Sequence, residues 1–358
     1  MLFGGASPEH DISVLTGLQA ARALSAAGRA PTCLYWSKTG EWSQVEAALE
    51  GKDFAPGATR KQRPLRLVTG PGGGFLGEGG ALRKERPLEI EAAVICCHGA
   101  PGEDGTLQSA LDLAGIPYTG PDAAAAALGM DKLAFGALAK VAGLPVLDRE
   151  AAVNQDGWAP SFAGPYILKP RFGGSSIGIE IVADPAAIVL LLNQSVHLRR
   201  GAVVEPYREA SADLEIAVRT WPEVTLSAIS KPQRSGVYSY QQKYVGGEGM
   251  VSAPREMNPD LPGSVAKTVR EVAMAVTALA RLRGISRVDF LLDGEEVYLN
   301  EVNTIPGSLA KHLWEEPFAG LLEGMIAEAG ARSTTNWTTA GADGTALRAA
   351  GTIASKLG

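Results

Sequence analysis

The segment RVDFLLDGEEVYLNEVN, residues 287–303, constrains the fold of this chain more than any other stretch. Two strand-like runs flank a DGEE turn, so the segment predicts a β-hairpin. Because strand side chains alternate between faces, Arg287 shares a face with Asp289, and Glu301 shares a face with Asn303. The hairpin would therefore gather two carboxylates, an amide and a guanidinium on one patch, which is too polar to bury without a partner.

A magnesium nucleotide is one partner that fits this patch. Hard divalent cations take oxygen ligands, and Mg²⁺ is often held by a few carboxylates together with phosphate groups. The alternative is an ordinary solvated hairpin face. The motifs in the rest of the chain have to decide between these two interpretations.

Length and composition exclude several classes of protein. At 358 residues, 46% of them hydrophobic, the chain is long enough for two or three globular domains. Its net charge is −6 and it shows no Lys/Arg cluster interleaved with aromatic residues, so we expect no nucleic-acid partner. The spacing of Cys33, Cys96 and Cys97 is not a disulfide framework, and the sequence shows neither a secretory signal nor a membrane-length apolar run. We expect a cytoplasmic protein with no membrane partner.

The first part of the chain is typical of a parallel α/β layer. A short strand runs into Gly4 and Gly5, a helical apolar pattern covers 14–24, and a second strand is expected at TCLYW. Ligands bind beyond the carboxyl ends of such strands, which places Glu9 at the ligand edge, or else makes it a first-turn acid favoured by the helix dipole. Residues 37–90 are less informative, and their glycine-rich TGPGGGFLGEGGA, which lacks the Gly-Lys-Ser/Thr of a phosphate loop, is expected to form a flexible turn region.

A second polar cluster follows AAVICC, a run typical of a buried strand. His98, Glu103 and Asp104 lie in the glycine- and proline-rich loop after it, ahead of a helix with Leu107 and Leu111 at helical spacing. A lone histidine is more often structural. The position of His98 at a strand end beside two acids favours a functional role.

Two lysines and a serine-rich loop come next. Lys132 follows the capping residue Asp131 and lies in the first turn of a helix, where a cation is either solvated or needed by an anion. Lys169 ends the strand GPYILKP, and the loop after it, RFGGSSIG, contains Ser175 and Ser176. Glycine amides, hydroxyl groups and a lysine can bind phosphate, although this spacing differs from a Walker loop.

The remaining segments carry fewer signals. Glu205 lies on the strand AVVEPY, and the loop 235–248 contains Lys243 and Tyr244 and is long enough to act as a lid. An apolar helix is expected before Gly284, and a single terminal helix is expected over SLAKHLWEEPFAGLLEGMIAEAG. Residues 331–358 are expected to form a peripheral helix or a disordered tail.

In sequence order, GGASPEHDIS, HGAPGEDGTLQ, GMDK, LKPRFGGSSIG, QKY, RVDF and NEVNTIPG resemble the motifs of the D-alanine–D-alanine ligase family of the ATP-grasp superfamily. The resemblance covers about residues 4–314. It implies an α/β protein, α+β in its nucleotide-binding part, with a three-domain ATP-grasp fold and an N-terminal parallel-sheet domain. The domains expected are 1–120 on the first-substrate side, 121–206 as the central ATP-grasp subdomain, 207–330 as the C-terminal ATP-grasp subdomain with the metal site, and 331–358 as the tail.

The resemblance also implies a reaction. The family makes D-alanyl-D-alanine for peptidoglycan through an acyl phosphate, with release of ADP and phosphate. The implied cofactors are ATP and two Mg²⁺ ions, for which Mn²⁺ can substitute, and the implied assembly is a homodimer. Water has to be excluded while the acyl phosphate persists, and the loop that carries Lys243 and Tyr244 is expected to close over the site.

The resemblance assigns roles to the polar residues noted above. The residues that match metal ligands are Asp289, Glu301 and Asn303. Those that match ATP contacts are Lys132, Lys169, Ser176, Glu205, Asp213 and Lys243. Those expected to act in catalysis are Glu9, Ser175, Tyr244, Arg287 and Gly307, and those expected at the substrates are His98, Glu103, His312 and Leu313. Among them, Arg287 and the Gly307 amide match the groups that stabilise the oxyanion.

Departures from the family pattern leave alternatives open. The segment EPYREASADLEI has Arg208 where an apolar residue is usual and one extra residue before Asp213, so Asp213 or Glu215 contacts the ribose. His312 and Leu313 stand where a serine and an apolar residue commonly bind the second substrate, so the acceptor is D-alanine or another amino acid such as D-serine. A noncatalytic nucleotide-binding module is the remaining alternative, and the complete set of site residues argues against it. The short first strand leaves open a start upstream of Met1.

Overall fold

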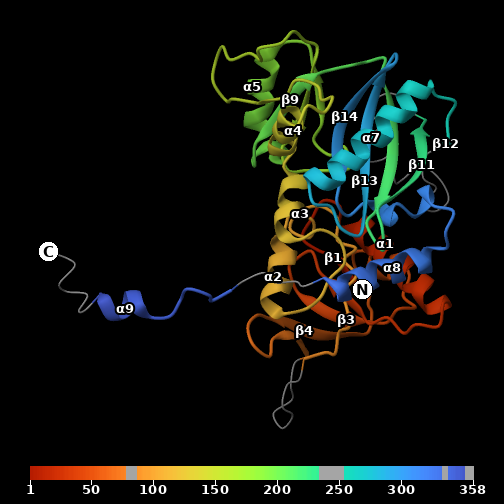
Figure 1. The fold of residues 1–358 in the computed structure, drawn as a ribbon, viewed down its shortest axis with the longest axis vertical. Helices are drawn as coiled ribbons and strands as arrows, with labels where there is room; N and C mark the ends of the chain where they lie inside the picture. The colour runs from red at the N-terminus through yellow and green to blue at the C-terminus, as the bar shows by residue number, and fades with distance from the viewer. Residues whose placement is uncertain (78–86, 234–253, 333–337, 351–358) are drawn as a thin grey trace.

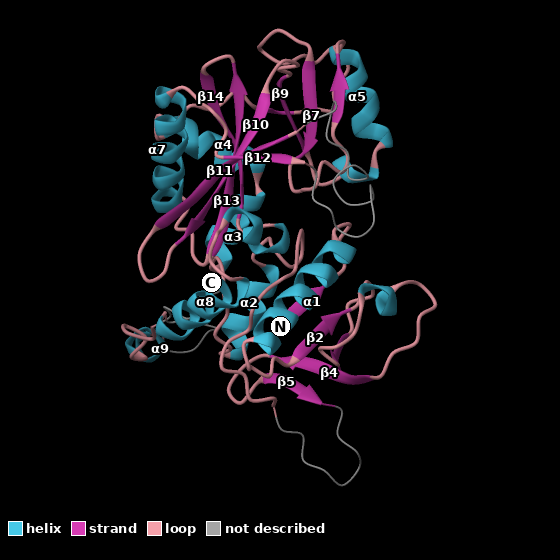
Figure 2. Ribbon diagram, turned by 90° about the vertical axis from the view of Figure 1, so that its right-hand side faces the viewer, coloured by secondary structure: helices cyan, strands magenta, loops and turns pink. Residues whose placement is uncertain are grey.

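The protein is built from three β-sheets with helices packed around them (Figure 1). The computed structural model describes residues 1–77, 87–233, 254–332 and 338–350. Figure 2 shows one sheet at one end of the molecule and the other two side by side at the opposite end, with helices between them. None of the helices in the described ranges combines the length and the apolar content that crossing a bilayer requires.

The N-terminal sheet begins parallel and continues antiparallel. Strand β1 pairs in parallel with β2, and single parallel bridges join Leu2 to Ile95 and Ala93 to Tyr118, which confirms the parallel layer expected from the sequence. Beyond β2 the order β1-β2-β3-β4-β5 is completed by antiparallel pairs. The strands are β1 (Leu2–Gly4), β2 (Cys33–Trp36), β3 (Trp42–Val45), β4 (Gln62–Val68) and β5 (Gly74–Gly77).

The antiparallel strands lie in a part of the sequence that carries few signals, and β5 corrects the expectation of a flexible turn region over the whole glycine-rich segment. These strands are short, and β4 exposes most of its residues, so no clear alternation of apolar side chains marks them in the sequence. Tertiary packing holds them instead: the ring of Trp42 stacks on that of Trp36 at 4.8 Å between centroids and meets that of Phe75 edge-on at 4.9 Å. Leu65 is buried in the same core.

Three helices cover this sheet: α1 (His10–Ala26), α2 (Thr106–Ala114) and α8 (Phe318–Ala331). Helix α1 packs closely on β1, and a Cβ atom at Gly17 would lie 2.4 Å from the Phe3 side chain, so only glycine fits there. The core of this layer also contains Ile305, Leu309 and Leu321, so the chain returns to the N-terminal layer near its end. This return brings the NTIPG segment back beside α1.

The central sheet has the antiparallel order β6-β9-β7-β8. Asp184 caps α5 by accepting a hydrogen bond from the Ala186 amide, as its sequence position predicts. Ile188 of α5 is buried against Leu168 and Val204 of this sheet. The elements are α3 (Ala123–Met130), α4 (Lys132–Val141), β6 (Glu150–Ala151), β7 (Tyr166–Pro170), β8 (Glu180–Val182), α5 (Pro185–Gln194) and β9 (Ala202–Pro206).

The third sheet has the antiparallel order β12-β11-β10-β13-β14, and its last two strands are the predicted hairpin. Helix α7 covers this sheet and buries Val265, Val269, Val272 and Val276, which confirms the apolar face read from the sequence. The elements are β10 (Ala212–Arg219), β11 (Thr225–Pro232), β12 (Arg255–Met257), α7 (Gly263–Leu279), β13 (Ile285–Asp293) and β14 (Glu296–Asn303).

The predicted terminal helix is wrong as a single element. A 3₁₀ segment, η3 (Gly307–Leu313), precedes α8, and the two are separated by residues 314–317, ending at Pro317. Ser308, Leu309 and Ala310 have φ values of 49°, 49° and 51°, in the left-handed region, so the backbone cannot continue as a regular α-helix there. Further on, α9 (Thr345–Ala349) stands away from the body of the molecule (Figure 1), which fits the peripheral helix expected in the tail.

Candidate functional site

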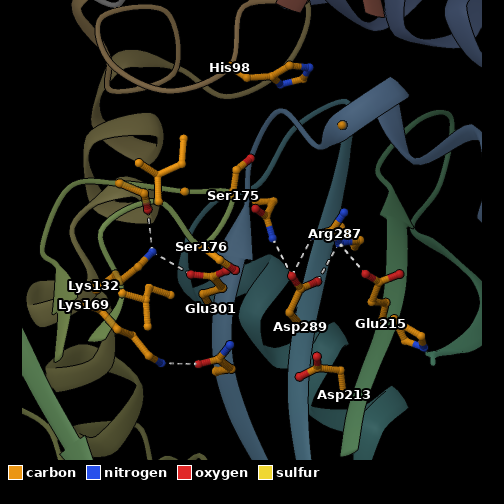
Figure 3. A pocket seen from close by; sticks show the side chains of 18 of the residues that line it. His98, Lys132, Lys169, Ser175, Ser176, Asp213, Glu215, Arg287, Asp289 and Glu301 are labelled. Carbon is orange, nitrogen blue, oxygen red and sulfur yellow. Dashed lines mark hydrogen bonds and ion pairs between the residues drawn. The ribbon is translucent and has the colours of Figure 1, made fainter. Parts of the chain in front are cut away.

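A cavity of about 320 Å³ receives side chains from the central and third sheets, and from helix α1 and the loops of the N-terminal layer (Figure 3). It brings together most of the residues singled out from the sequence, although they are spread over three hundred positions. Those that line it are Glu9, His98, Glu103, Lys132, Lys169, Ser175, Ser176, Glu205, Asp213, Arg287, Asp289, Glu301, Asn303, Gly307 and His312.

Of the predicted residues that the structure describes, Leu313 does not line the cavity. Leu313 is 2% exposed and packs in the core of the N-terminal layer, because the left-handed turn at residues 308–310 directs it inward. The structure therefore corrects the expectation that Leu313 contacts a substrate. Lys243 and Tyr244 lie outside the described residues, and their roles stay predictions.

The hairpin positions its polar side chains as the alternation predicts. Arg287 pairs with Asn303 in the strand register, and Asp289 pairs with Glu301. The Arg287 guanidinium donates from Nε and Nη2 to the two Asp289 oxygens at 2.6 and 2.8 Å, and Asn303 Nδ2 donates to Asp289 Oδ2 at 2.9 Å. Burial raises the pKa of Asp289, and the adjacent guanidinium opposes this shift.

A β-bulge adds a residue to the site that sequence reasoning missed. The register shifts between Asp289 and Phe290, whose partners are Glu301 and Leu299, so Asn300 is the extra residue of this fully described hairpin. Strict alternation would turn Asn300 away from Glu301, but both line the cavity. Asn300 Oδ1 accepts a hydrogen bond from Lys169 Nζ at 3.0 Å.

Lys169 belongs to a buried charge cluster. Its Nζ atom lies 2.8 Å from Glu205 Oε2, and Arg149 Nε lies 2.7 Å from Glu205 Oε1. Glu205 is 1% exposed. Burial by itself raises the pKa of Glu205, but Lys169 and Arg149 outweigh it and hold the pKa below its usual value. Glu205 thus anchors Lys169, and Arg149, which no local motif marks, completes the cluster.

At the start of its helix Lys132 was expected to be either solvated or paired with an anion, and the structure pairs it with one. It lies in the first turn of α4, after Asp131, whose side chain accepts from the Leu133 and Ala134 amides as predicted. Lys132 Nζ is 2.6 Å from Glu301 Oε2 and donates to the Gly173 carbonyl at 2.8 Å. Both lysines therefore project into the cavity toward the hairpin (Figure 3).

Glu9 contacts the serine loop. It occupies the N-cap position of α1, but its side chain makes no capping hydrogen bond to this fully described helix and instead accepts one from Ser175 Oγ. Ser175 and Ser176 have φ values of 52° and 57°, a left-handed turn that side chains rarely adopt. A Cβ atom at Gly174 would lie 3.0 Å from Glu9 Oε2, so any larger residue there would press on the Glu9 carboxylate.

His98 and Glu103 hold the NTIPG turn. His98 Nδ1 lies 2.8 Å from the Ile305 carbonyl and Nε2 lies 2.8 Å from Thr16 Oγ1, while Glu103 accepts from the Ile305 amide at 2.9 Å and the Gly99 amide at 3.0 Å. Burial lowers the pKa of His98 to about 4. Burial, reinforced by the charge of Glu9, raises the pKa of Glu103 to about 8. These contacts position the Gly307 backbone.

Glu215 lies between several basic groups. Its Oε2 is 3.1 Å from Arg255 Nη1 and 3.8 Å from His312 Nε2, and its Oε1 is 3.8 Å from Arg287 Nε (Figure 3). Burial by itself raises the pKa of Glu215, but the neighbouring basic groups, Arg287 first among them, outweigh it and bring the pKa to about 2. This carboxylate faces the Arg287 side of the cavity. Of the two acids considered for the ribose, Asp213 is therefore the better candidate.

Comparison with known proteins identifies the family. The model described as D-ala D-ala ligase N-terminus matches residues 1–121, and the model described as D-ala D-ala ligase C-terminus matches residues 139–317. The chain belongs to the D-alanine–D-alanine ligase family. A D-alanine–D-alanine ligase of a Bradyrhizobium species is 32% identical over 93% of this chain and 95% of its own length. One of a Methylobacterium species is also 32% identical, over 93% of this chain and 91% of its own.

Solved structures of the family share the fold. The D-alanine–D-alanine ligase of Helicobacter pylori superposes with a TM-score of 0.72 at 26% identity, covering 91% of this chain and 96% of its own. The VanG D-Ala:D-Ser ligase of Enterococcus faecalis gives 0.71 at 23% identity, covering 92% and 98%, and supports the fold alone. These likenesses confirm the ATP-grasp fold expected from the motifs.

The residues of this D-alanine–D-alanine ligase family member suit a hard cation that is completed by other ligands. Among the described residues, no group of three or more His, Cys, Asp and Glu side chains is arranged as a metal site. Asp289 and Glu301 are opposite each other in register and Asn303 stands beside them, so the hairpin offers two carboxylates and an amide oxygen. Mg²⁺ accepts such a set when phosphate and water oxygens fill its remaining positions.

Proposed function

We propose that this chain is an ATP-dependent D-alanine–D-alanine ligase, which joins two D-alanine molecules through an acyl phosphate and releases ADP and phosphate. One observation carries the proposal for this member of the family. Lys132 and Lys169 converge on the acidic hairpin in one cavity, directly beside the Arg287–Asp289 pair. Activation of a carboxylate requires these groups together: cations that bind phosphate, oxygen ligands for a metal, and a guanidinium that faces the oxyanion.

The first step of the proposed reaction phosphorylates the carboxylate of the first D-alanine. A carboxylate is a poor acyl donor, and transfer of the γ-phosphoryl group depends mainly on positioning and on neutralising charge. Lys132 and Lys169, held by Glu301 and Glu205, would exchange part of their present contacts for phosphate oxygens. Mg²⁺ held by Asp289, Glu301 and Asn303 would supply further charge neutralisation when bound.

The second step forms the amide. The amine of the acceptor attacks the acyl phosphate, and Arg287 with the Gly307 amide would stabilise the oxyanion that develops. Glu9, positioned by Ser175, would hold the ammonium group of the first D-alanine. Ser176 and Asp213 line the same cavity and would contact ATP. The product would serve peptidoglycan synthesis.

Further features of the proposal extend beyond the site. We expect two Mg²⁺ ions, replaceable by Mn²⁺, a homodimer, a cytoplasmic location, and domain boundaries near residues 120, 206 and 330. We also expect Lys243 to reach the terminal phosphates and Tyr244 to join the Glu9–Ser175 link.

Phosphate release tests the proposal. The purified protein, supplied with ATP, Mg²⁺ and single amino acids, should release phosphate with D-alanine alone and form D-alanyl-D-alanine. L-alanine should give no release, because the proposed substrates are D-amino acids. ATP binding without phosphate release under any amino acid would favour the noncatalytic module instead.

A second candidate keeps the mechanism and changes the acceptor. His312 lines the cavity on the Arg287 side, 3.8 Å from Glu215, which makes this end of the cavity more polar than a serine and an apolar residue would. Phosphate release only when D-alanine is combined with another amino acid, such as D-serine, would select this candidate over the first.

A further inference from the structure

Arg149 is a buried arginine that lies behind the cavity, directly before β6. Its side chain is only 6% exposed, and it is not among the residues that line the cavity. Gly136 on α4 leaves space for it, because a Cβ atom there would lie 2.8 Å from Arg149 Nη1. Glycine in the interior of a helix is less stable than alanine. The fold therefore accepts a weaker helix in order to hold a guanidinium at this position.

Backbone groups fix the orientation of this guanidinium. Arg149 Nη2 donates to the Asn300 carbonyl at 2.9 Å, and Nη1 donates to the Lys132 carbonyl. Toward Glu205 the guanidinium makes an ion pair only, with Nε 2.7 Å from Oε1 and without hydrogen-bond geometry. The backbone of two cavity residues, one on α4 and one on β14, thus places the charge of Arg149 beside Glu205.

The cluster of Arg149, Lys169 and Glu205 carries one positive charge in excess. Among the described residues, Glu205 is the one acid in contact with both cations, and each of its oxygens faces one of them. Burial lowers the pKa of Lys169, Glu205 opposes this shift, and the charge of Arg149 adds to it. The two cations therefore compete for one carboxylate, and an anion beside Lys169 would relieve their repulsion.

Lys169 differs in this respect from other basic residues of the cavity. Three of them each have an acid within 3.1 Å: Lys132 with Glu301, Arg287 with Asp289, and Arg255 with Glu215. Lys169 shares its acid with Arg149. Since Lys169 lines the cavity and Arg149 does not, a ligand in the cavity meets the excess charge of the cluster at Lys169.

We propose that Arg149 is a positioning residue for the nucleotide: it occupies one oxygen of Glu205 and so leaves the charge of Lys169 available to the phosphate groups of ATP. The inference rests on the proposed ligase function, in which Lys169 binds phosphate. Without Arg149, Glu205 would neutralise Lys169 by itself, and phosphate would be bound more weakly. With Arg149 in place, the phosphate supplies the negative charge that the cluster lacks.

Binding of ADP and of adenosine separates this role from a structural one, because adenosine lacks the phosphates. Calorimetric titration in the presence of Mg²⁺ measures both dissociation constants. Arg149→Met should weaken ADP relative to adenosine by about 10-fold or more, the order expected for one charge in a site of reduced dielectric constant. Glu205→Gln should shift the ratio in the opposite direction, because it removes the negative charge instead. Arg29→Met, at the exposed pair with Glu91, is the matched control and should leave the ratio unchanged.

Steady-state kinetics give a second readout. Arg149→Met should raise the KM for ATP and leave the KM for D-alanine unchanged. Arg149→Lys keeps the positive charge in the space beside Gly136, so its preference for ADP over adenosine should stay close to that of wild type. A structural defect would instead weaken both ligands. Equal losses of ADP and adenosine affinity in Arg149→Met, or a ratio that stays at the wild-type value, would therefore overturn the inference.

The other two variants decide the question where Arg149→Met does not fold. A preference for ADP that is unchanged or lower in Glu205→Gln would then overturn the inference, and so would a loss of that preference in Arg149→Lys. Proteins that show the expected shifts in ADP binding but release no phosphate with D-alanine would contradict the proposed function and still support the role of Arg149.

Discussion

The buried cluster around Glu205 makes a quantitative prediction about stability. Glu205→Gln keeps the volume of the side chain but removes the only negative charge in contact with Lys169 and Arg149 within the described part of this cluster. Removing one partner of a buried ion pair costs about 3–5 kcal/mol, because the remaining charge is left uncompensated. We expect a loss near the lower end, about 3 kcal/mol of unfolding free energy.

The hydrogen bonds that remain after Glu205→Gln explain why we expect a loss near the lower end of this range. Arg149 still donates to the Asn300 carbonyl at 2.9 Å and to the Lys132 carbonyl, and Lys169 still donates to Asn300 Oδ1. The glutamine oxygen can accept from one of the two cations. By the same reasoning Lys169→Met should cost less, about 2 kcal/mol, since Glu205 keeps Arg149 as a partner.

Urea unfolding followed by circular dichroism measures both variants, and Glu91→Gln is the matched control. Glu91 forms an exposed pair with Arg29 at 3.1 Å, so its substitution should change the unfolding free energy by less than about 1 kcal/mol. A loss for Glu205→Gln no larger than that of the control would refute the reasoning. So would a larger loss for Lys169→Met than for Glu205→Gln.

Three further predictions follow from single side chains. Glu301→Gln should lower the unfolding free energy by less than Glu205→Gln, since Glu301 is partly exposed and the glutamine oxygen can still accept from Lys132, but it should abolish most phosphate release. Turnover equal to wild type would contradict its role. Burial raises the pKa of Glu103 to about 8, so the folded state keeps a proton that the unfolded state loses near pH 4.5. The unfolding free energy of wild type relative to Glu103→Gln should therefore fall by several kcal/mol as pH rises from about 4.5 to about 8. A constant difference between the two proteins in urea melts across that range would argue against this. Ser308→Gly should raise the unfolding free energy by about 1 kcal/mol, because Ser308 holds a φ of 49°, and a lower melting temperature would count against this.

Local sequence patterns were sufficient for several parts of the structure. The period of two in 287–303 predicted the hairpin and the shared face of Arg287 and Asp289. The spacing of valines predicted the buried face of α7, and the capping roles of Asp131 and Asp184 followed from their neighbours. These features depend on the geometry of one strand or one helix, which repeats every few residues and is therefore readable in one segment.

The family motifs predicted which residues gather at the cavity, but not how each is held. Glu205 was expected to contact ATP and is bound by Lys169 and Arg149. His98 and Glu103 were expected at the substrates and hold the Ile305 backbone. The roles of these residues toward ligands stay predictions. The motifs identify residue types and positions, whereas each partner comes from a distant part of the chain.

Three features were decided by tertiary structure alone. The bulge brings Asn300 to the cavity, although strand alternation would point it to the other face. The left-handed turn at 308–310 buries Leu313 and leaves His312 at the cavity. Arg255 reaches Glu215 from another strand. The sequence by itself determined the hairpin, several helices with their apolar faces, and the family, because these follow from short-range periodicity and ordered motifs. Which polar groups neutralise one another depends on how three sheets pack, since a buried charge takes its partner from whatever side chain the fold brings within a few ångströms.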